Sequence, residues 1–128
     1  MITNTRLTTI ANTTVFTATQ DGISAPNAST NPGQTRAVTT MILCNTGTPN
    51  LTDESVDTAA VTIYMKDNGI AASTSNMIVS SLTIPAGETV FFSDEKLILE
   101  GSGNTCDEIT VQSSAANLIT VTVSSLPV

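Results

Sequence analysis

The chain contains no histidine and no tryptophan, and only four of its 128 residues are basic. Histidine is the side chain whose ordinary pKa lies closest to neutral pH, so its absence removes the most common general acid or base. The same absence excludes Ser-His-Asp and Cys-His catalytic arrangements and argues against a zinc site. We therefore expect that the protein is not an enzyme and that it uses no cofactor and no metal.

The scarcity of basic residues also limits the partners of the chain. Four lysines and arginines are too few to follow a phosphate backbone, and a net charge of −7 would repel an anionic membrane surface. No apolar run approaches the ~20 residues of a membrane-spanning helix. We expect no nucleic-acid partner and no membrane partner. The acidic residues are scattered except in one loop and two pairs: Asp53, Glu54 and Asp57; Asp94 and Glu95; Asp107 and Glu108.

Cysteine is scarce as well. Cys44 and Cys106 are the two cysteines, and neither belongs to a CxxC motif. The first sixteen residues lack a long apolar core, so we expect no secretory signal. The two cysteines could form one disulfide in an oxidising compartment, whereas synthesis in the cytosol would leave both thiols reduced.

What the chain does contain is a large share of β-forming and hydroxyl-bearing residues. Hydrophobic residues make up 40% of the chain and charged residues only 12%, which argues against disorder. Much of the polar surface must therefore come from threonine, serine and asparagine. Because hydroxyls cost less to bury than charges, neighbouring subunits can cover such a surface cheaply. This composition favours an assembling protein.

Period-two alternation recurs along the chain between turn residues, which is typical of all-β proteins. It predicts an antiparallel, jelly-roll-like β-sandwich of about eight strands. The expected strands are residues 6–10, 13–19, 37–45, 59–66, 77–84, 106–112 and 118–124, with residues 89–92 and 96–100 forming one interrupted strand or two short ones.

The alternation also predicts which side chains face the core. The clearest inward sets are Val61, Ile63 and Met65; Ile109 and Val111; and Ile119, Val121 and Val123. Ile78, Leu82 and Ile84 are expected to share a face, and Phe91 and Phe92 are expected in the core. Asn68-Gly69 predicts a hairpin with a type I′ turn, since both residues tolerate a positive φ.

The first 36 residues have a different character. Residues 20–36 form a long polar stretch without periodicity, and so long a loop is often functional. We divide the chain into an N-terminal arm with a polar loop (1–36) and a compact domain (37–128). The arm either adds a strand to a neighbour or pairs within its own sheet. The candidate partner-binding residues are Arg6, Leu7, Ile10, Val15, Phe16, Asn27 and Arg36.

Four segments carry a family resemblance. They read LTIPAGETV at 82–90, KLILEG at 96–101, ITVQSS at 109–114 and ITVTVS at 119–124. This pattern resembles the C-terminal half of small β-sandwich virion structural proteins of tailed bacteriophages, and the likeness extends over residues 37–124. The chain departs from the pattern after Gly101, where Ser-Gly-Asn-Thr-Cys replaces the usual acidic residue.

The resemblance implies a component of the virion that is assembled in the host cytoplasm. The expected role is a capsid decoration (cement) protein that binds the outer shell, with the major capsid protein or other virion proteins as partners. Family members also imply a homo-oligomer, commonly a trimer. A neck, tail or baseplate accessory protein stays an alternative. So does a receptor- or carbohydrate-binding module of the virion, for which Asp53, Glu54 and Asp57 would offer a calcium loop.

Overall fold

The computed structural model describes residues 1–93 and 96–128, so the predicted acidic pair at 94–95 lies outside the described residues. Within them the chain forms strands and no helix. The strands are β1 (Ile2–Arg6), β2 (Thr13–Thr17), β3 (Gly33–Asn45), β4 (Ala59–Asp67), β5 (Met77–Ile84), β6 (Thr89–Phe92), β7 (Leu97–Gly103), β8 (Thr105–Ser113) and β9 (Ile119–Pro127). Their ladders are antiparallel, which confirms the predicted all-β class.

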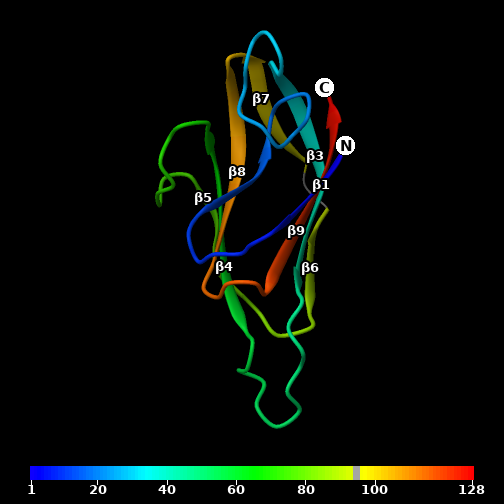
Figure 1. Cartoon of the computed structure of the whole chain (residues 1–128), viewed down its shortest axis with the longest axis vertical. Helices are drawn as coiled ribbons and strands as arrows, with labels where there is room; N and C mark the ends of the chain where they lie inside the picture. The colour runs from blue at the N-terminus through cyan, green and yellow to red at the C-terminus, as the bar shows by residue number, and fades with distance from the viewer. Residues whose placement is uncertain (94–95) are drawn as a thin grey trace.

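The ladders join the strands into one open sheet. Its order is β1-β9-β3-β7-β8-β4-β5, with β2 added to β8 and β6 added to β3. The sheet bends, so that β8, β4 and β5 face β3, β9 and β6 (Figure 1). Since the pairing links all of these strands into a single sheet, the jelly-roll-like sandwich itself stays a prediction.

One hydrophobic cluster fills the space between the facing strands. The predicted inward residues of β4, β8 and β9 are fully buried there: Val61, Ile63, Ile109, Val111, Ile119, Val121 and Val123. Met65 is partly buried against the same cluster. Each such side chain contributes about 1.5–3 kcal/mol through burial, so this cluster is the main source of stability.

The N-terminal segment belongs to the same sheet. β1 covers residues 2–6 rather than the predicted 6–10, and it pairs with β9 from Ile2↔Ser124 to Arg6↔Thr120. β2 pairs with β8, and a bulge between Thr14 and Phe16 turns both Val15 and Phe16 into the core. Of the two alternatives for the arm, the structure has the one in which it pairs within its own chain.

The predicted division after residue 36 falls inside a continuous strand, because β3 begins at Gly33. The polar loop is correspondingly shorter than the predicted 20–36. It contains an isolated bridge between Asn27 and Asn31, and Thr19 forms another with Gly33. The loop is therefore anchored at both of its ends.

Strand β5 matches its predicted bounds, but not the predicted face of Ile78. A register shift separates Val61 from Ile63 in the β4–β5 ladder, and Ser81 has a φ of +49°. The Ser81 N–H donates to Thr62 Oγ1 at 3.2 Å instead of to a ladder carbonyl. This bulge places Val79 against the core and leaves Ile78 exposed.

The predicted type I′ hairpin at Asn68-Gly69 is wrong. β4 ends at Asp67 and β5 begins only at Met77, and of the two turn residues only Gly69 has a positive φ. The tight hairpin lies elsewhere, between β7 and β8, where Ser102 pairs with Thr105. There Gly103 has a φ of +57°, as the first central residue of a type II′ turn requires.

Candidate functional site

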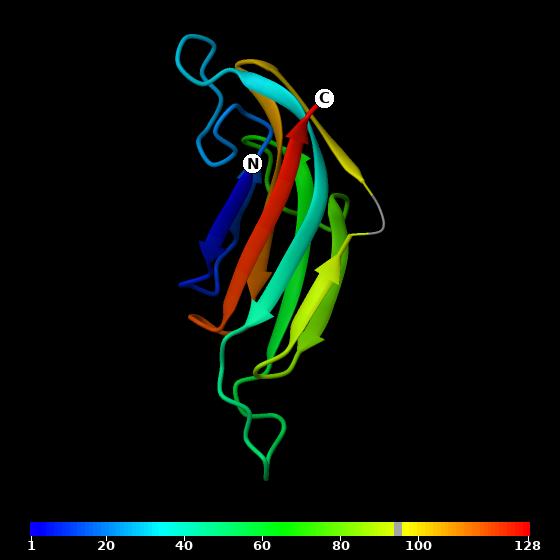
Figure 2. The same ribbon diagram turned by 90° about the vertical axis from the view of Figure 1, so that its right-hand side faces the viewer.

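An apolar groove lies along the open side of the sheet, between β5 and β6. Within the described residues β5 pairs with β4 alone and β6 pairs with β3 alone, so each strand has one free edge. β5 and β6 lie on facing parts of the bent sheet, and both border its open side (Figures 1 and 2). The outer N–H and C=O groups of such edges are available to pair with a strand from another protein.

A groove of about 380 Å³ occupies this side, and among residues 1–93 and 96–128 none that lines it is charged. Phe91 is 64% exposed and Ile78 is 41% exposed, and both side chains line this groove. A large exposed apolar patch on a small protein typically marks a contact surface. We call this groove the β5–β6 groove; its lining residues are Met41, Ile78, Val79, Phe91, Phe92, Ser93 and Leu97.

The register of β6 explains why Phe91 points away from the core. Phe92 lies opposite Met41 and Val90 lies opposite Leu43, and both β6 residues pack against the core. Phe91 alternates to the outer face. The prediction that Phe91 lies in the core is therefore wrong, because three consecutive apolar residues gave no alternation to interpret.

The turn that connects β5 to β6 is held in place by hydrogen bonds. The Glu88 N–H donates to the Pro85 carbonyl at 3.1 Å, and Gly87 between them has a φ of +76°. The backbone of buried Asn45 pairs with this turn, since Asn45 N–H donates to the Glu88 carbonyl at 2.9 Å. The segment LTIPAGETV thus forms the end of β5, a fixed turn and the start of β6.

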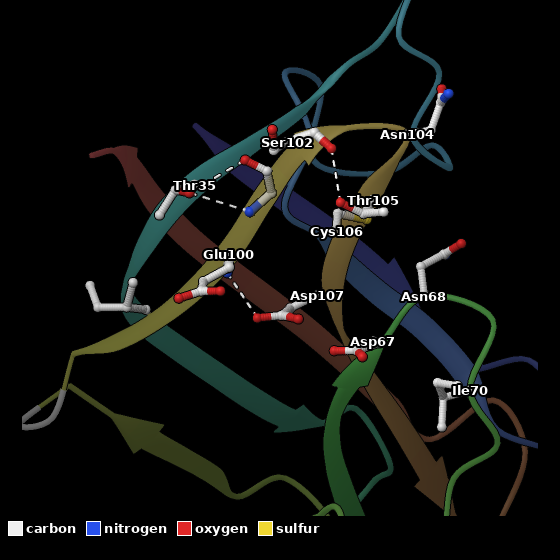
Figure 3. A pocket seen from close by; sticks show the side chains of 12 residues that line it. Thr35, Asp67, Asn68, Ile70, Glu100, Ser102, Asn104, Thr105, Cys106 and Asp107 are labelled. Carbon is white, nitrogen blue, oxygen red and sulfur yellow. Dashed lines mark hydrogen bonds between the residues drawn. The ribbon is translucent and has the colours of Figure 1, made fainter.

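A second groove, of about 530 Å³, lies where β7 diverges from β8 and β4 (Figure 3). Three carboxylates line it: Asp67, Glu100 and Asp107. Asp67 and Asp107 lie opposite each other in the β4–β8 ladder. The Glu100 N–H donates to Asp107 Oδ2 at 2.8 Å, so this side chain takes the place of a ladder carbonyl. Ile70 and Ile98 line the same groove.

Burial and the neighbouring carboxylates change the pKa of Asp107 in this groove. Burial raises the pKa of Asp107, and the carboxylates of Asp67 and Glu100 raise it further against the lowering effect of the Glu100 hydrogen bond. Within residues 1–93 and 96–128, no three aspartate, glutamate, cysteine or histidine side chains are placed to hold a metal ion together. The surroundings of Asp107 therefore favour its protonated form.

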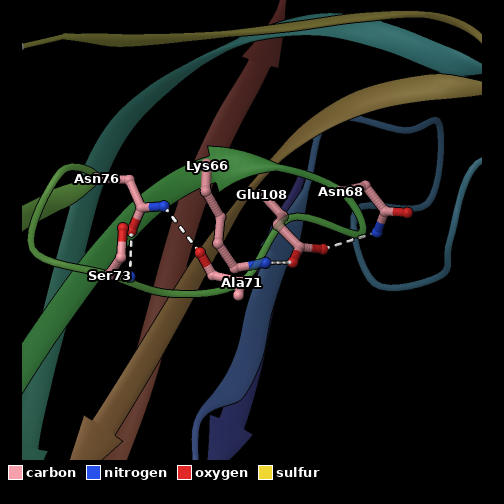
Figure 4. Close-up of polar contacts among 6 residues, drawn as sticks. All are labelled: Lys66, Asn68, Ala71, Ser73, Asn76 and Glu108. Carbon is pink, nitrogen blue, oxygen red and sulfur yellow. Dashed lines mark hydrogen bonds and ion pairs between the residues drawn. The ribbon is translucent and has the colours of Figure 1, made fainter.

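A buried ion pair lies in the same β4–β8 ladder. Lys66 Nζ contacts Glu108 Oε1, and both side chains are less than a tenth exposed. Asn68 Nδ2 donates to the other oxygen, Glu108 Oε2, at 2.7 Å (Figure 4). The following loop is ordered by Asn76, which accepts from the Ser73 N–H and donates to the Ala71 carbonyl, both at 3.0 Å. The Glu108 carboxylate therefore contacts the Lys66 ammonium group with one oxygen and accepts from the Asn68 amide with the other.

The predicted partner-binding residues do not form a single surface. Leu7, Val15 and Phe16 are buried in the core of their own chain. Arg36 is only 4% exposed, and it donates from Nε to Ser125 Oγ at 3.0 Å and from Nη1 to Gln34 Oε1 at 2.9 Å. These four side chains satisfy internal contacts, so they are not available in this structure to an external partner.

The other three predicted residues are exposed, but they lie in different segments of the chain. Arg6 Nη2 donates to the Asn117 carbonyl at 2.9 Å in an exposed position. Ile10 is exposed in the segment between β1 and β2. Asn27 Oδ1 accepts from the Ser29 N–H at 3.0 Å within the polar loop. None of them lines the β5–β6 groove.

The loop between β3 and β4 extends well beyond the sheet (Figures 1 and 2) and carries Leu51, which is 98% exposed. The Asp53 carboxylate of this loop is used locally, since hydrogen bonds from Ser55 lower its pKa. The two cysteines are free; Cys106 is buried and Cys44 is half-buried.

Comparisons with family models, with curated proteins and with solved structures found no match to this chain. In the described part of the chain, no helix is long and apolar enough to cross a membrane.

Proposed function

We propose that this protein is a non-enzymatic structural component of a bacteriophage virion that acts by adhering to other virion proteins. Its specific role in this proposal is capsid decoration: the protein binds the outer shell and bridges neighbouring subunits. The virion assignment rests on the resemblance of residues 37–124 to small phage structural proteins. The adhesive mode of action rests on the β5–β6 groove.

The single observation that carries the adhesive role is the exposure of Phe91 on a free-edged strand. Phe91 and Ile78 present apolar surface from the two strands that border the groove, and the lining residues that the structure describes carry no charge. Aromatic side chains of this kind dominate the binding energy of protein interfaces. The free edges of β5 and β6 add backbone hydrogen-bonding capacity beside them.

Repetition strengthens such contacts on a shell. Each copy needs only a modest affinity, because contacts that are linked through a capsid or a homo-oligomer act by avidity. A bent sheet with one continuous core supplies a rigid body between the contacts. We propose the major capsid protein as the main partner and a homo-oligomer as the binding unit.

Co-sedimentation with expanded empty capsids tests the proposal. The parent protein should pellet with the capsids, and Phe91→Ser should stay in the supernatant while melting at the same temperature as the parent. The matched control is Ile98→Ser, which removes an exposed apolar side chain outside the β5–β6 groove. Equal binding by the parent and Phe91→Ser would show that the β5–β6 groove does not contribute to capsid binding.

The same experiment separates the alternatives. Binding to isolated tails or necks, with none to capsids, would assign the protein to those structures instead. Binding to a glycan array that depends on calcium would assign it to receptor recognition. Turnover of a small molecule would contradict a structural role altogether.

A further inference from the structure

The turn after β4 combines an exposed glycine with an asparagine that is held by the fold. The Asn68 N–H donates to the Cys106 carbonyl at 2.8 Å, and the Ile70 N–H closes the turn on the Asp67 carbonyl at 3.1 Å. Between them Gly69 has a φ of +84°, and no described residue other than its neighbours Asn68 and Ile70 has a heavy atom within 4 Å of the position that a Cβ would occupy. Gly69 therefore stands in open space.

The Gly69 N–H and the Asn68 side-chain amide differ in whether they have a hydrogen-bond partner. The Gly69 N–H donates to no backbone acceptor within residues 1–93 and 96–128. The Asn68 side chain is engaged instead, since Nδ2 donates to Glu108 Oε2 at 2.7 Å. Glu108 in turn contacts Lys66 Nζ. The free amide of Gly69 thus follows directly on an asparagine whose leaving nitrogen faces a carboxylate.

We propose that Asn68 is a site of spontaneous covalent modification, at which the backbone nitrogen of Gly69 attacks the side-chain carbonyl carbon of Asn68. The new bond joins Gly69 N to Asn68 Cγ, the bond from Cγ to Nδ2 breaks, and Nδ2 leaves as ammonia with the proton from Gly69 N. Water then opens the five-membered succinimide at either carbonyl to give aspartate or isoaspartate. The net change is amide plus water to carboxylic acid plus ammonia.

Glycine is the residue that permits this attack. It has no Cβ to shield its nitrogen, and it reaches backbone conformations that other residues rarely adopt. The open space around Gly69 leaves the ring room to form. This inference does not depend on the proposed virion role.

The structure also gives the reaction a consequence. The amide that now donates to Glu108 Oε2 becomes a carboxylate, so two negative groups face each other beside a single cation, Lys66. Like charges at this distance repel, and Glu108 is buried although Asn68 itself is exposed. The modification therefore acts as a slow, one-way charge switch that weakens the end of the β4–β8 ladder.

Incubation of the full-length folded protein at mildly alkaline pH, followed by tryptic mass mapping, tests the chemistry. The peptide spanning residues 67–96 should gain one mass unit at Asn68 and contain isoaspartate, while Asn12 should stay unchanged. Asn68→Gln keeps the side-chain amide but requires a larger ring, so we expect a several-fold loss of rate. Gly69→Ala should slow the reaction in the same way.

Two results would overturn the proposal. An Asn68 that stays intact in the folded protein but reacts in urea would show that Glu108 protects the amide. A stable product that has lost ammonia without gaining water, and that trypsin no longer cleaves after Lys66, would show that Lys66 Nζ rather than the Gly69 nitrogen is the nucleophile. The consequence is tested separately: Asn68→Asp should melt below Asn68→Ser, and equal melting would remove the proposed switch.

Discussion

The side-chain amide of Asn45 donates a hydrogen bond of 2.8 Å to the backbone carbonyl of Ile84. The same nitrogen donates to the Asp57 carbonyl at 2.7 Å, and Asn45 Oδ1 accepts from the Gly47 N–H at 2.9 Å. Asn45 is almost completely buried. One side chain thus joins the end of β3, the loop before β4 and the end of β5, directly beneath the turn that leads to the β5–β6 groove.

Asn45→Ala should therefore destabilise the protein by about 3 kcal/mol, because it leaves buried backbone groups without partners. Urea unfolding measures the change. Asn12→Ala is the matched control, since Asn12 is exposed, and it should stay within about 0.5 kcal/mol of the parent. Similar values for the two variants would contradict the role given to Asn45.

The two phenylalanines at positions 16 and 91 offer a direct test of the N-terminal segment. Phe16 is fully buried and Phe91 is 64% exposed. Phe16→Ala should cost about 3–5 kcal/mol of folding free energy, whereas Phe91→Ala should cost less than about 0.5 kcal/mol. Thermal melting of both variants checks this. If Phe16→Ala melts like the parent, the segment is not part of the core.

The buried pair of Lys66 and Glu108 should behave differently when broken and when replaced. Glu108→Leu alone leaves a buried cation and should cost about 3–5 kcal/mol. The double variant with Lys66→Met removes both charges and should recover most of that loss. Chemical unfolding of the single and double variants measures the coupling, and additive losses would rule out a direct interaction.

Asp107 should make stability depend on pH. Its pKa is raised in the folded state, chiefly by burial, so the folded chain binds a proton that the unfolded chain releases over the window above the ordinary aspartate pKa. Stability should consequently fall as pH rises through that window. Asp107→Asn should raise the melting temperature at neutral pH and give no gain at pH values where the parent carboxyl is protonated. A gain of equal size at both pH values would exclude titration as the cause.

The alternation of apolar and polar residues correctly predicted several strands and the side chains that face the core. β4 and β5 begin where the sequence placed them, and the inner faces of β8 and β9 are as expected. The β-bulges were not predictable, because an extra residue reverses the face without a local signal. This is how Val15 and Phe16 both turn inward and how Ile78 turns outward.

The candidate site could not be predicted for a related reason. Whether a strand lies at an edge depends on partners that are distant in the sequence, so nothing local distinguishes β6 from a central strand. Asn68-Gly69 was informative about a turn but not about its type, because the loop that follows is too long for a two-residue hairpin.

The location of the chain on purified particles tests the central claim most directly. High-resolution density of intact virions should contain this protein as a repeated feature of the shell, with Phe91 and Ile78 of the β5–β6 groove buried against a neighbouring subunit. Virions that lack the chain, or that hold it with this groove open to solvent, would contradict the account.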